Sequence, residues 1–221
     1  VKGTAWALAD SGRSLAGWEG VLLGDVPVGA GLSSSAAAEL AVARAFHRGA
    51  DWSWDAAAMA QLGQRAENSW VGVNCGIMDQ MISACGKDGH ALLLDCRSLQ
   101  GQHVPLPDGV AVVVLDTSTR RGLVDSAYNE RRAQCEVAAR FFSVGALRAV
   151  DEETFANRMH ALDETPRRRA RHVISENART ERAAEAMRQG DARALGLLLN
   201  ESHVRLRDDF SVSSEALDAM V

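Results

Sequence analysis

The sequence has little positive charge and no long apolar stretch. Its 24 lysines and arginines are outnumbered by 29 aspartates and glutamates, which gives a net charge of −5, and its only lysines are Lys2 and Lys87. An acidic chain has no overall electrostatic attraction for nucleic acid. No apolar run reaches the roughly 20 residues that a membrane helix needs, and no signal-peptide pattern is visible. We therefore expect neither a nucleic-acid partner nor a membrane partner.

Disulfide and metal-cysteine patterns are missing as well. The cysteines are Cys75, Cys85, Cys96 and Cys135, none of which forms a C-x-x-C pair or has a histidine at metal-ligand spacing. Unpaired thiols in a chain of 221 residues are typical of a reducing compartment, which predicts a cytoplasmic protein. No internal repeat and no low-complexity linker is visible.

Local patterns predict a mixed first half and a helix-rich second half. The turn around Asp108 marks the expected boundary between them. Ser53 is the expected N-cap of the third helix. A strand is predicted over residues 18–26, and buried strands are predicted over residues 91–95 and 110–115. Helices are predicted over residues 1–10, 33–48, 55–70, 77–85, 125–142, 154–160, 166–187, 191–206 and from 213 onward.

The most informative stretch runs from Asp25 to Ala38 and reads DVPVGAGLSSSAAA. It follows an apolar run and opens an alanine-rich helix. Around Gly29 and Gly31, free backbone N–H groups and the positive end of the helix dipole suit a phosphate group. A serine hydroxyl there can cap the helix or reach a metal bound to the phosphates. The alternative interpretation is an ordinary serine-capped helix after a tight turn.

A second stretch, residues 74–80, reads NCGIMDQ and places Asp79 among apolar side chains. A carboxylate in such surroundings must point to solvent or have a partner. Asp79 is therefore either a solvent-facing residue or an acid at a pocket floor that acts on a reacting hydroxyl. Glu67, near the end of the preceding helix, is either a surface residue or a Mg²⁺ ligand beside the serine loop.

Three further features lie in the second half. Arg120 and Arg121 follow a predicted strand and could serve an anionic ligand, while the hydroxyl of Tyr128 could bond a sugar; a solvated helix is the alternative. The basic run RRRARH at 167–172 has no interleaved aromatics, so it is interpreted as a solvated helix face rather than an RNA site. The charged residues at 203–209 are interpreted as structural ion pairs.

The pair of motifs VPVGAGLSSSAA and CGIMDQ, in this order, resembles the GHMP small-molecule kinases and, within them, the galactokinase family. The resemblance covers nearly the whole chain. This family has no Walker A lysine, and the loop here has none. Further matching stretches are GHALLLDCRSL from Gly89, SAYNERRAQCE from Ser126, RRARHVISE from Arg168 and ESHVRLRDDFSVS from Glu201.

The resemblance implies a role for individual residues. Ser35 and Glu67 match Mg²⁺ ligands, and Asp79 matches the catalytic acid beside the anomeric hydroxyl of the sugar. Gly76 and Tyr128, with Asp79, match sugar contacts. Arg120 matches an arginine near the active site. The residues implied to hold the ATP phosphates are Gly29, Ala30, Gly31, Leu32, Ser33, Ser34, Ser35 and Ala36.

The implied reaction is transfer of the γ-phosphate of ATP to O1 of galactose, with Mg²⁺ as cofactor, by a monomer. The implied fold is α+β, a two-domain GHMP-kinase fold with the active site between the domains. Residues 1–108 would belong to the N-terminal phosphate-loop (ATP-binding) domain and residues 109–221 to the C-terminal helix-rich α+β domain.

Two alternative functions remain open: a non-catalytic galactose- and ATP-sensing regulator of galactokinase-like sequence, and a GHMP kinase for N-acetylgalactosamine. Family members also extend beyond both ends of this sequence, with an N-terminal sugar-binding segment and a C-terminal glycine-rich motif. The expectation is therefore that the chain corresponds to the middle of a galactokinase, truncated at both ends, and does not phosphorylate galactose by itself.

Overall fold

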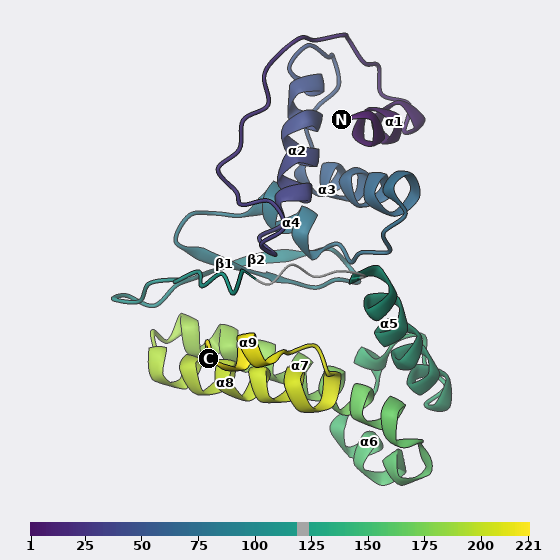
Figure 1. Cartoon of the computed structure of the whole chain (residues 1–221), viewed down its shortest axis with the longest axis vertical. Helices are drawn as coiled ribbons and strands as arrows, with labels where there is room; N and C mark the ends of the chain where they lie inside the picture. Colours follow the sequence, from purple (N-terminus) through teal and green to yellow (C-terminus); the bar gives the residue numbers. More distant parts are fainter. Residues whose placement is uncertain (119–123) are drawn as a thin grey trace. The chain divides into compact units, whose positions relative to one another are not determined.

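The computed structural model describes residues 1–118 and 124–221, and for residues 124–127 it describes the backbone alone. The chain divides into two compact units, Val1–Val104 and Pro105–Val221. Figure 1 gives the element labels used below. Each unit has its own core, and each is described by itself.

The first unit is a layer of helices with a small sheet. Its two strands are joined by a short connection, so they pair as an antiparallel hairpin. A π-helix, η1, continues α3 directly. The elements are α1 (Lys2–Asp10), α2 (Ser34–His47), α3 (Ala56–Arg65), η1 (Ala66–Val71), α4 (Met78–Cys85), β1 (His90–Leu94) and β2 (Gly101–Pro105).

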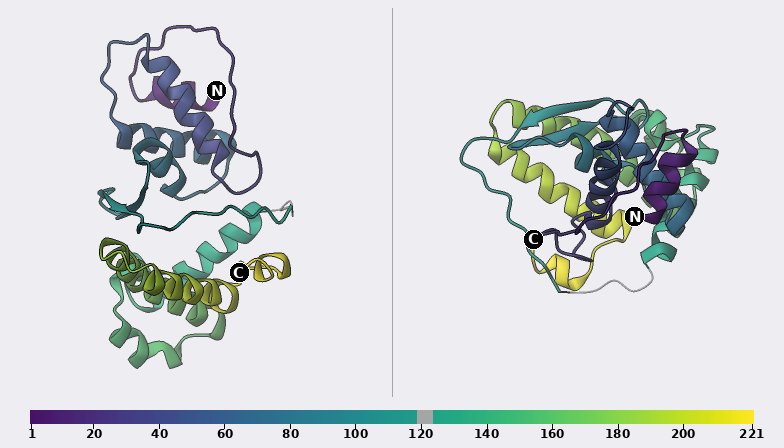
Figure 2. Two further views of the ribbon diagram at one scale, coloured as in Figure 1. Left: turned by 90° about the vertical axis from the view of Figure 1, so that its left-hand side faces the viewer. Right: turned by 90° about the horizontal axis from the view of Figure 1, so that it is seen from above.

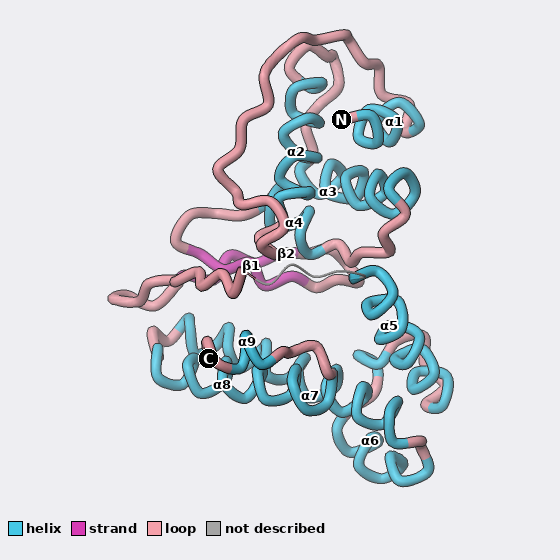
Figure 3. Tube along the Cα trace, viewed as in Figure 1, coloured by secondary structure: helices cyan, strands magenta, loops and turns pink. Residues whose placement is uncertain are grey.

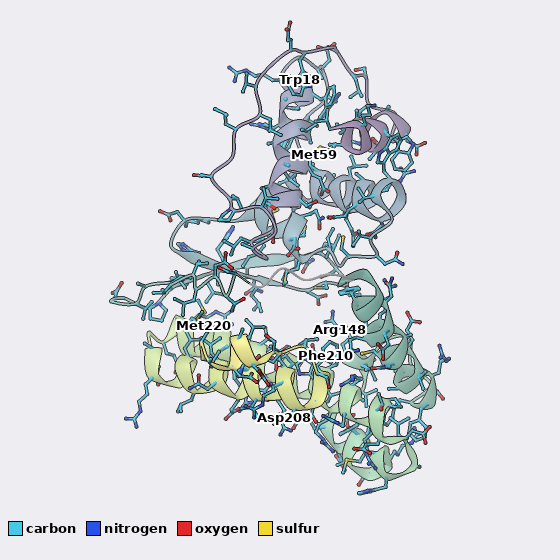
Figure 4. The ribbon with its side chains drawn as sticks, in the orientation of Figure 1. Trp18, Met59, Arg148, Asp208, Phe210 and Met220 are labelled. Carbon is cyan, nitrogen blue, oxygen red and sulfur yellow. The ribbon has the colours of Figure 1, made fainter. Side chains whose placement is uncertain are left out.

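Two apolar clusters hold this unit together. Leu8 of α1 and Met59 of α3 are fully buried in the first, where Leu40 of α2 packs against them (Figure 4). Ile77 and Met81 bury the inner face of α4 in the second cluster. Each fully buried side chain of this size contributes about 1.5–3 kcal/mol to stability. The clusters fix α2, α3 and α4 against one another, and these helices carry the candidate site.

The first residue of α3 differs slightly from the prediction. Asp55, and not Ser53, is the N-cap, because its carboxylate accepts the N–H of Ala58 at 2.9 Å. Both residue types cap well, so the sequence alone did not separate them.

Two of the predicted strands are wrong. Residues 18–26 and 110–115 have no strand hydrogen bonding and run as loop (Figure 3). Their apolar side chains are exposed: 87% for Leu23 and 75% for Val112. A strand needs a neighbour to satisfy its N–H and C=O groups, and an apolar run does not itself supply one. The strand predicted at residues 91–95 is confirmed by β1, and its partner β2 was not predicted.

The second unit is helical. The longest helix, α7, begins with Glu164 and Pro166 in its first turn, and the chain turns at Gly190 just beyond its end. Helices α7 and α8 run alongside each other (Figure 2). The elements are α5 (Val124–Phe141), η2 (Leu147–Ala149), α6 (Glu152–Arg158), η3 (Met159–Ala161), α7 (Glu164–Arg188), α8 (Ala192–Arg205), η4 (Leu206–Phe210) and α9 (Glu215–Asp218).

The core of this unit contains both apolar and polar residues. Phe142, Phe155 and Ile174 belong to the apolar cluster. Arg169 and His172 of the RRRARH run are buried, so the interpretation of that run as a solvated face is wrong for these two residues. They are buried because η4 covers this part of α7, and Arg169 donates to the main-chain carbonyl of Asp209.

The charged residues at 203–209 form the ion pairs that the sequence suggested. The carboxylate of Asp209 is buried and accepts from Arg205 at 2.9 Å and from Arg171 at 3.2 Å. Arg207 pairs with Asp208, and Nε2 of His203 lies 3.0 Å from a carboxylate oxygen of Asp218. A buried carboxylate needs such partners, so this cluster has a structural role. Among the described residues, no helix is long and apolar enough to cross a membrane.

Candidate functional site

The phosphate-binding loop predicted from sequence lies immediately before α2. Gly29 and Gly31 have left-handed backbone conformations, with φ of 75° and 76°. A Cβ atom built on either glycine would meet nothing within 4 Å, so the space beside this backbone is open. Residues that carry a side chain rarely adopt this backbone conformation, whereas glycine does so freely. A ligand can therefore approach the main chain of this loop closely.

The start of α2 leaves backbone donors available. Ser33 is the N-cap residue, with a left-handed φ of 59°, and its hydroxyl makes no capping bond. The first helical hydrogen bond runs from the N–H of Ala37 to the carbonyl of Ser33. The N–H groups of Ser34, Ser35 and Ala36 therefore precede the hydrogen-bond ladder. Such groups, at the positive end of the helix dipole, suit an anion.

Ser35 and Glu67, predicted separately as magnesium ligands, lie together. The hydroxyl of Ser35 donates to Oε1 of Glu67 at 2.9 Å, which joins the first turn of α2 to η1. The π-helical turn after α3 carries Glu67 to this position. Figure 1 shows α3 beside α2, which agrees with their contact.

Glu39 is a member of this site that the sequence analysis missed. It lies one turn after Ser35 on α2, and its Oε1 is 3.3 Å from the Ser35 hydroxyl. Burial, and then the charge of Glu67, raise the pKa of Glu39 to about 7. The spacing i, i+4 within the predicted helix was the signal that could have revealed it.

Cys75 and Gln80 complete the surroundings of the two carboxylates. The thiol of Cys75 lies 3.7 Å from Oε2 of Glu67, and burial followed by the Glu67 charge raises its pKa to about 11. The amide of Gln80 donates to Oε2 of Glu67 at 2.9 Å. Cys75 is therefore a neutral thiol rather than a nucleophile.

The oxygen-rich pair fits a magnesium ion. Mg²⁺ prefers oxygen ligands and takes one or two carboxylates from a protein, with phosphates completing its shell. Two adjacent carboxylates and a hydroxyl at the phosphate loop meet this description. The described residues contain no group of three or more histidine, cysteine, aspartate or glutamate side chains that could hold a metal ion.

Asp79 lies in the first turn of α4. Its side chain is half-buried, between the exposed Met78 and the fully buried Gln80. No described residue donates a side-chain hydrogen bond to its carboxylate or forms an ion pair with it. The packing of Ile77 and Met81 into the core fixes α4. Asp79 is thus a carboxylate on a rigid helix, available to a ligand.

The structure does not bring the other predicted site residues together with this group. Gly76 is an exposed loop residue just before α4. Tyr128 lies on α5 in the second unit and is 47% exposed. Arg120 and Arg121 lie outside the described residues. The grouping of these residues around a sugar remains a prediction.

The first part of the chain is similar to a known protein family. Residues 1–87 match the family model described as the GHMP kinases N terminal domain. The match includes the phosphate loop, Glu67 and Asp79. In this part the chain is similar to the GHMP kinases, as its motifs predicted.

A solved structure narrows the resemblance. The chain is similar to the galactokinase of Lactococcus lactis, whose crystal structure was determined in complex with galactose. The TM-score is 0.82 and the sequence identity 33%, over 98% of this chain and 58% of that protein. The fold is that of a galactokinase, and this confirms the resemblance inferred from CGIMDQ and its companion motifs. The chain spans 58% of the length of this relative.

Proposed function

We propose that this chain serves in the ATP-dependent phosphorylation of galactose at O1. The observation that carries the proposal is the phosphate loop with the Ser35–Glu67 hydrogen bond of 2.9 Å at its end. That arrangement joins free backbone N–H groups to a carboxylate pair suited to Mg²⁺. The similarity to a galactokinase determined in complex with galactose supports the sugar.

In the proposed reaction the chain positions charges more than it forms bonds. The γ-phosphorus gains a bond to O1 of galactose as its bond to the bridging oxygen of ADP breaks. The N–H groups of residues 29–36 hold the phosphates, and Asp79 accepts or attracts the hydrogen of the attacking hydroxyl. Mg²⁺ held by Ser35 and Glu67 would screen the phosphate charge. Gly76 and Tyr128 are proposed sugar contacts, and Arg120 is proposed to lie near the reacting groups.

Two matched glycine variants test the loop in this chain. Gly31→Ala adds a methyl group to the proposed phosphate site, while Gly12→Ala adds one at a loop position with a similar φ of 83° and equally open space. Both changes carry the same backbone strain. We expect Gly31→Ala to weaken the binding of ATP, and of inorganic tripolyphosphate, by about tenfold, equivalent to about 1.4 kcal/mol.

Isothermal titration calorimetry in the presence of Mg²⁺ provides the measurement. Gly12→Ala should bind both ligands as the unmodified chain does. Equal affinities for the two variants, or no binding by the unmodified chain, would contradict the assignment of the loop. The tripolyphosphate arm separates the phosphate site from any contribution of adenine.

A further inference from the structure

Gln80 is the most deeply buried polar residue near the candidate site. It lies on α4 directly after Asp79, and its side chain has no solvent exposure. Its amide nitrogen donates to Oε2 of Glu67 at 2.9 Å and to Oε2 of Glu39 at 3.2 Å. An amide group has two hydrogens, so it can serve both carboxylates at once.

No charged side chain pairs with these two carboxylates in the described part of the chain, and the N-terminal ammonium of Val1 is the smallest of the named influences on Glu39. Among the described residues, no lysine, arginine or histidine forms an ion pair with Glu39 or Glu67. The groups that join them are neutral: the hydroxyl of Ser35 on one side and the amide of Gln80 on the other. Because like charges repel at this separation, their closeness depends on these donors.

The side-chain carbonyl of Gln80 indicates that the amide nitrogen determines how this side chain is oriented. Oε1 is buried and has no hydrogen-bond partner among the described residues. An unsatisfied buried acceptor costs about 1–3 kcal/mol. The amide nevertheless directs its nitrogen to the carboxylates, so its contacts with Glu39 and Glu67 outweigh the unmet carbonyl.

Gly63 on α3 leaves room for this arrangement. A Cβ atom there would lie 3.1 Å from Oε2 of Glu39 and 3.2 Å from Cγ of Gln80. Both distances are tighter than ordinary side-chain contacts. Helices α2, α3 and α4 therefore meet at one point. Gly63 of α3 leaves room there for Gln80 of α4 to donate a hydrogen bond to Glu39 of α2.

We propose that Gln80 is a positioning residue that holds Glu39 and Glu67 side by side opposite Ser35, so that the cation site exists before the metal–nucleotide complex binds. Glu39 is the second carboxylate of this arrangement. The inference rests on the proposed function, since it concerns the cation that accompanies ATP. Because Gln80 and Asp79 are neighbours on α4, the same helix positions the cation site and the acid.

Gln80→Leu tests this role, with Gln64→Leu as its matched control. Gln64 lies on α3, and its side-chain amide donates to the main-chain carbonyl of Cys75 at 3.2 Å. It is therefore a glutamine close to the site whose hydrogen bond does not involve Glu39 or Glu67. Loss of a group that orients a metal ligand typically weakens metal affinity about 10–100-fold. We expect that loss for Mn²⁺–ATP with Gln80→Leu, and no more than about a twofold change with Gln64→Leu.

The experiment measures binding in two arms. Mn²⁺–ATP binding to this chain is followed by water-proton relaxation enhancement, and metal-free ATP binding by calorimetry in EDTA. Gln80→Leu should weaken only the first, whereas Gly31→Ala should weaken both. A general loss of structure would lower both arms together, so the difference between the arms reports the cation site itself.

Gln80→Met provides a second variant of similar length and volume, for use if thermal unfolding shows that Gln80→Leu has no folded state. Unchanged Mn²⁺–ATP affinity in a folded Gln80 variant would overturn the positioning role and leave the proposed function intact. Failure of the unmodified chain to bind either form of ATP would overturn the proposed function instead.

Discussion

At the residue scale, the candidate site has more oxygen acceptors than hydrogens to satisfy them. Ser35 offers one hydrogen to two carboxylates, and it lies closer to Glu67, at 2.9 Å, than to Glu39, at 3.3 Å. Burial in this acidic environment keeps the pKa of Glu39 at about 7. A divalent cation would relieve this excess of negative charge.

Removal of both proposed ligands should therefore change the metal requirement. We expect Ser35→Ala combined with Glu67→Ala to raise the Mg²⁺ concentration needed for half-maximal ATP binding. The measurement is a Mg²⁺ titration at fixed ATP. An unchanged titration curve in the folded double variant would count against both residues as ligands.

Asp79 should separate chemistry from nucleotide binding. The assay uses a chimera in which this chain replaces the matching part of the Lactococcus lactis galactokinase. Asp79→Asn should reduce turnover at least about 100-fold, the usual contribution of a positioned acid or base, while ATP affinity stays within a few-fold because the phosphate loop is separate. Turnover above about a tenth of the unmodified rate would exclude the catalytic role.

At the scale of elements, the helices were largely predictable and the strands were not. Helix boundaries follow from local signals, such as Asp191 and Ser214 capping α8 and α9. The exposed runs at 18–26 and 110–115 have strand composition without a pairing partner, and composition does not reveal whether a partner exists. The π-helical continuation of α3, which carries Glu67, also lacked a sequence signal.

A glycine within α3 tests the meeting point of the three helices. Gly63→Ala should gain about 1 kcal/mol of helix propensity, yet its methyl group would crowd Glu39 and Gln80. We expect no net gain in stability and a several-fold loss of Mn²⁺–ATP affinity. Thermal unfolding and relaxation enhancement provide the two measurements.

Gly196 in α8 is the control, because a Cβ atom there would meet nothing within 4 Å. Gly196→Ala should raise stability by about 0.5–1 kcal/mol. If Gly63→Ala stabilised the chain to the same extent without affecting the metal complex, the crowding argument would be wrong.

At the scale of the whole molecule, each unit is stabilised by its own buried residues. In the second unit, His172 is buried, and the centre of its ring lies 4.6 Å from the centre of the ring of Phe210. Burial is the main cause that lowers the pKa of His172 below 6.5; Glu176 and Asp209 oppose this effect, while Arg179 and Arg169 reinforce it. The histidine is therefore neutral in the folded chain.

This burial gives the stability of the chain a defined dependence on pH. Below pH 6.5, His172 becomes protonated in the unfolded chain but stays neutral in the folded chain. The free energy of unfolding therefore falls as pH decreases from 6.5 toward the lowered pKa of folded His172. His172→Phe should flatten this part of the curve relative to the unmodified chain. Replacement of the exposed His160 by phenylalanine should leave the slope unchanged. Urea unfolding between pH 5 and 8 measures the slopes, and parallel curves for all three proteins would refute the effect.

The proposed metal ligands could be predicted from the sequence, but the residues that orient these ligands could not. Ser35 and Glu67 were assigned from motifs, and they lie within hydrogen-bond distance. Glu39 and Gln80 were missed because a glutamate and a glutamine on helices have no signature until three helices pack together. The contacts that orient a site are long-range, whereas motifs are local.

The most direct test of the proposed function is product formation by the chimera. With galactose and Mg-ATP, we expect ³¹P NMR to show galactose 1-phosphate, with the phosphorus coupled to the anomeric proton, and little product from N-acetylgalactosamine. A chimera that has a cooperative thermal transition and binds ATP and galactose, yet forms no sugar phosphate, would contradict the proposed kinase and favour a non-catalytic sensor. Preferential phosphorylation of N-acetylgalactosamine would contradict the proposed substrate.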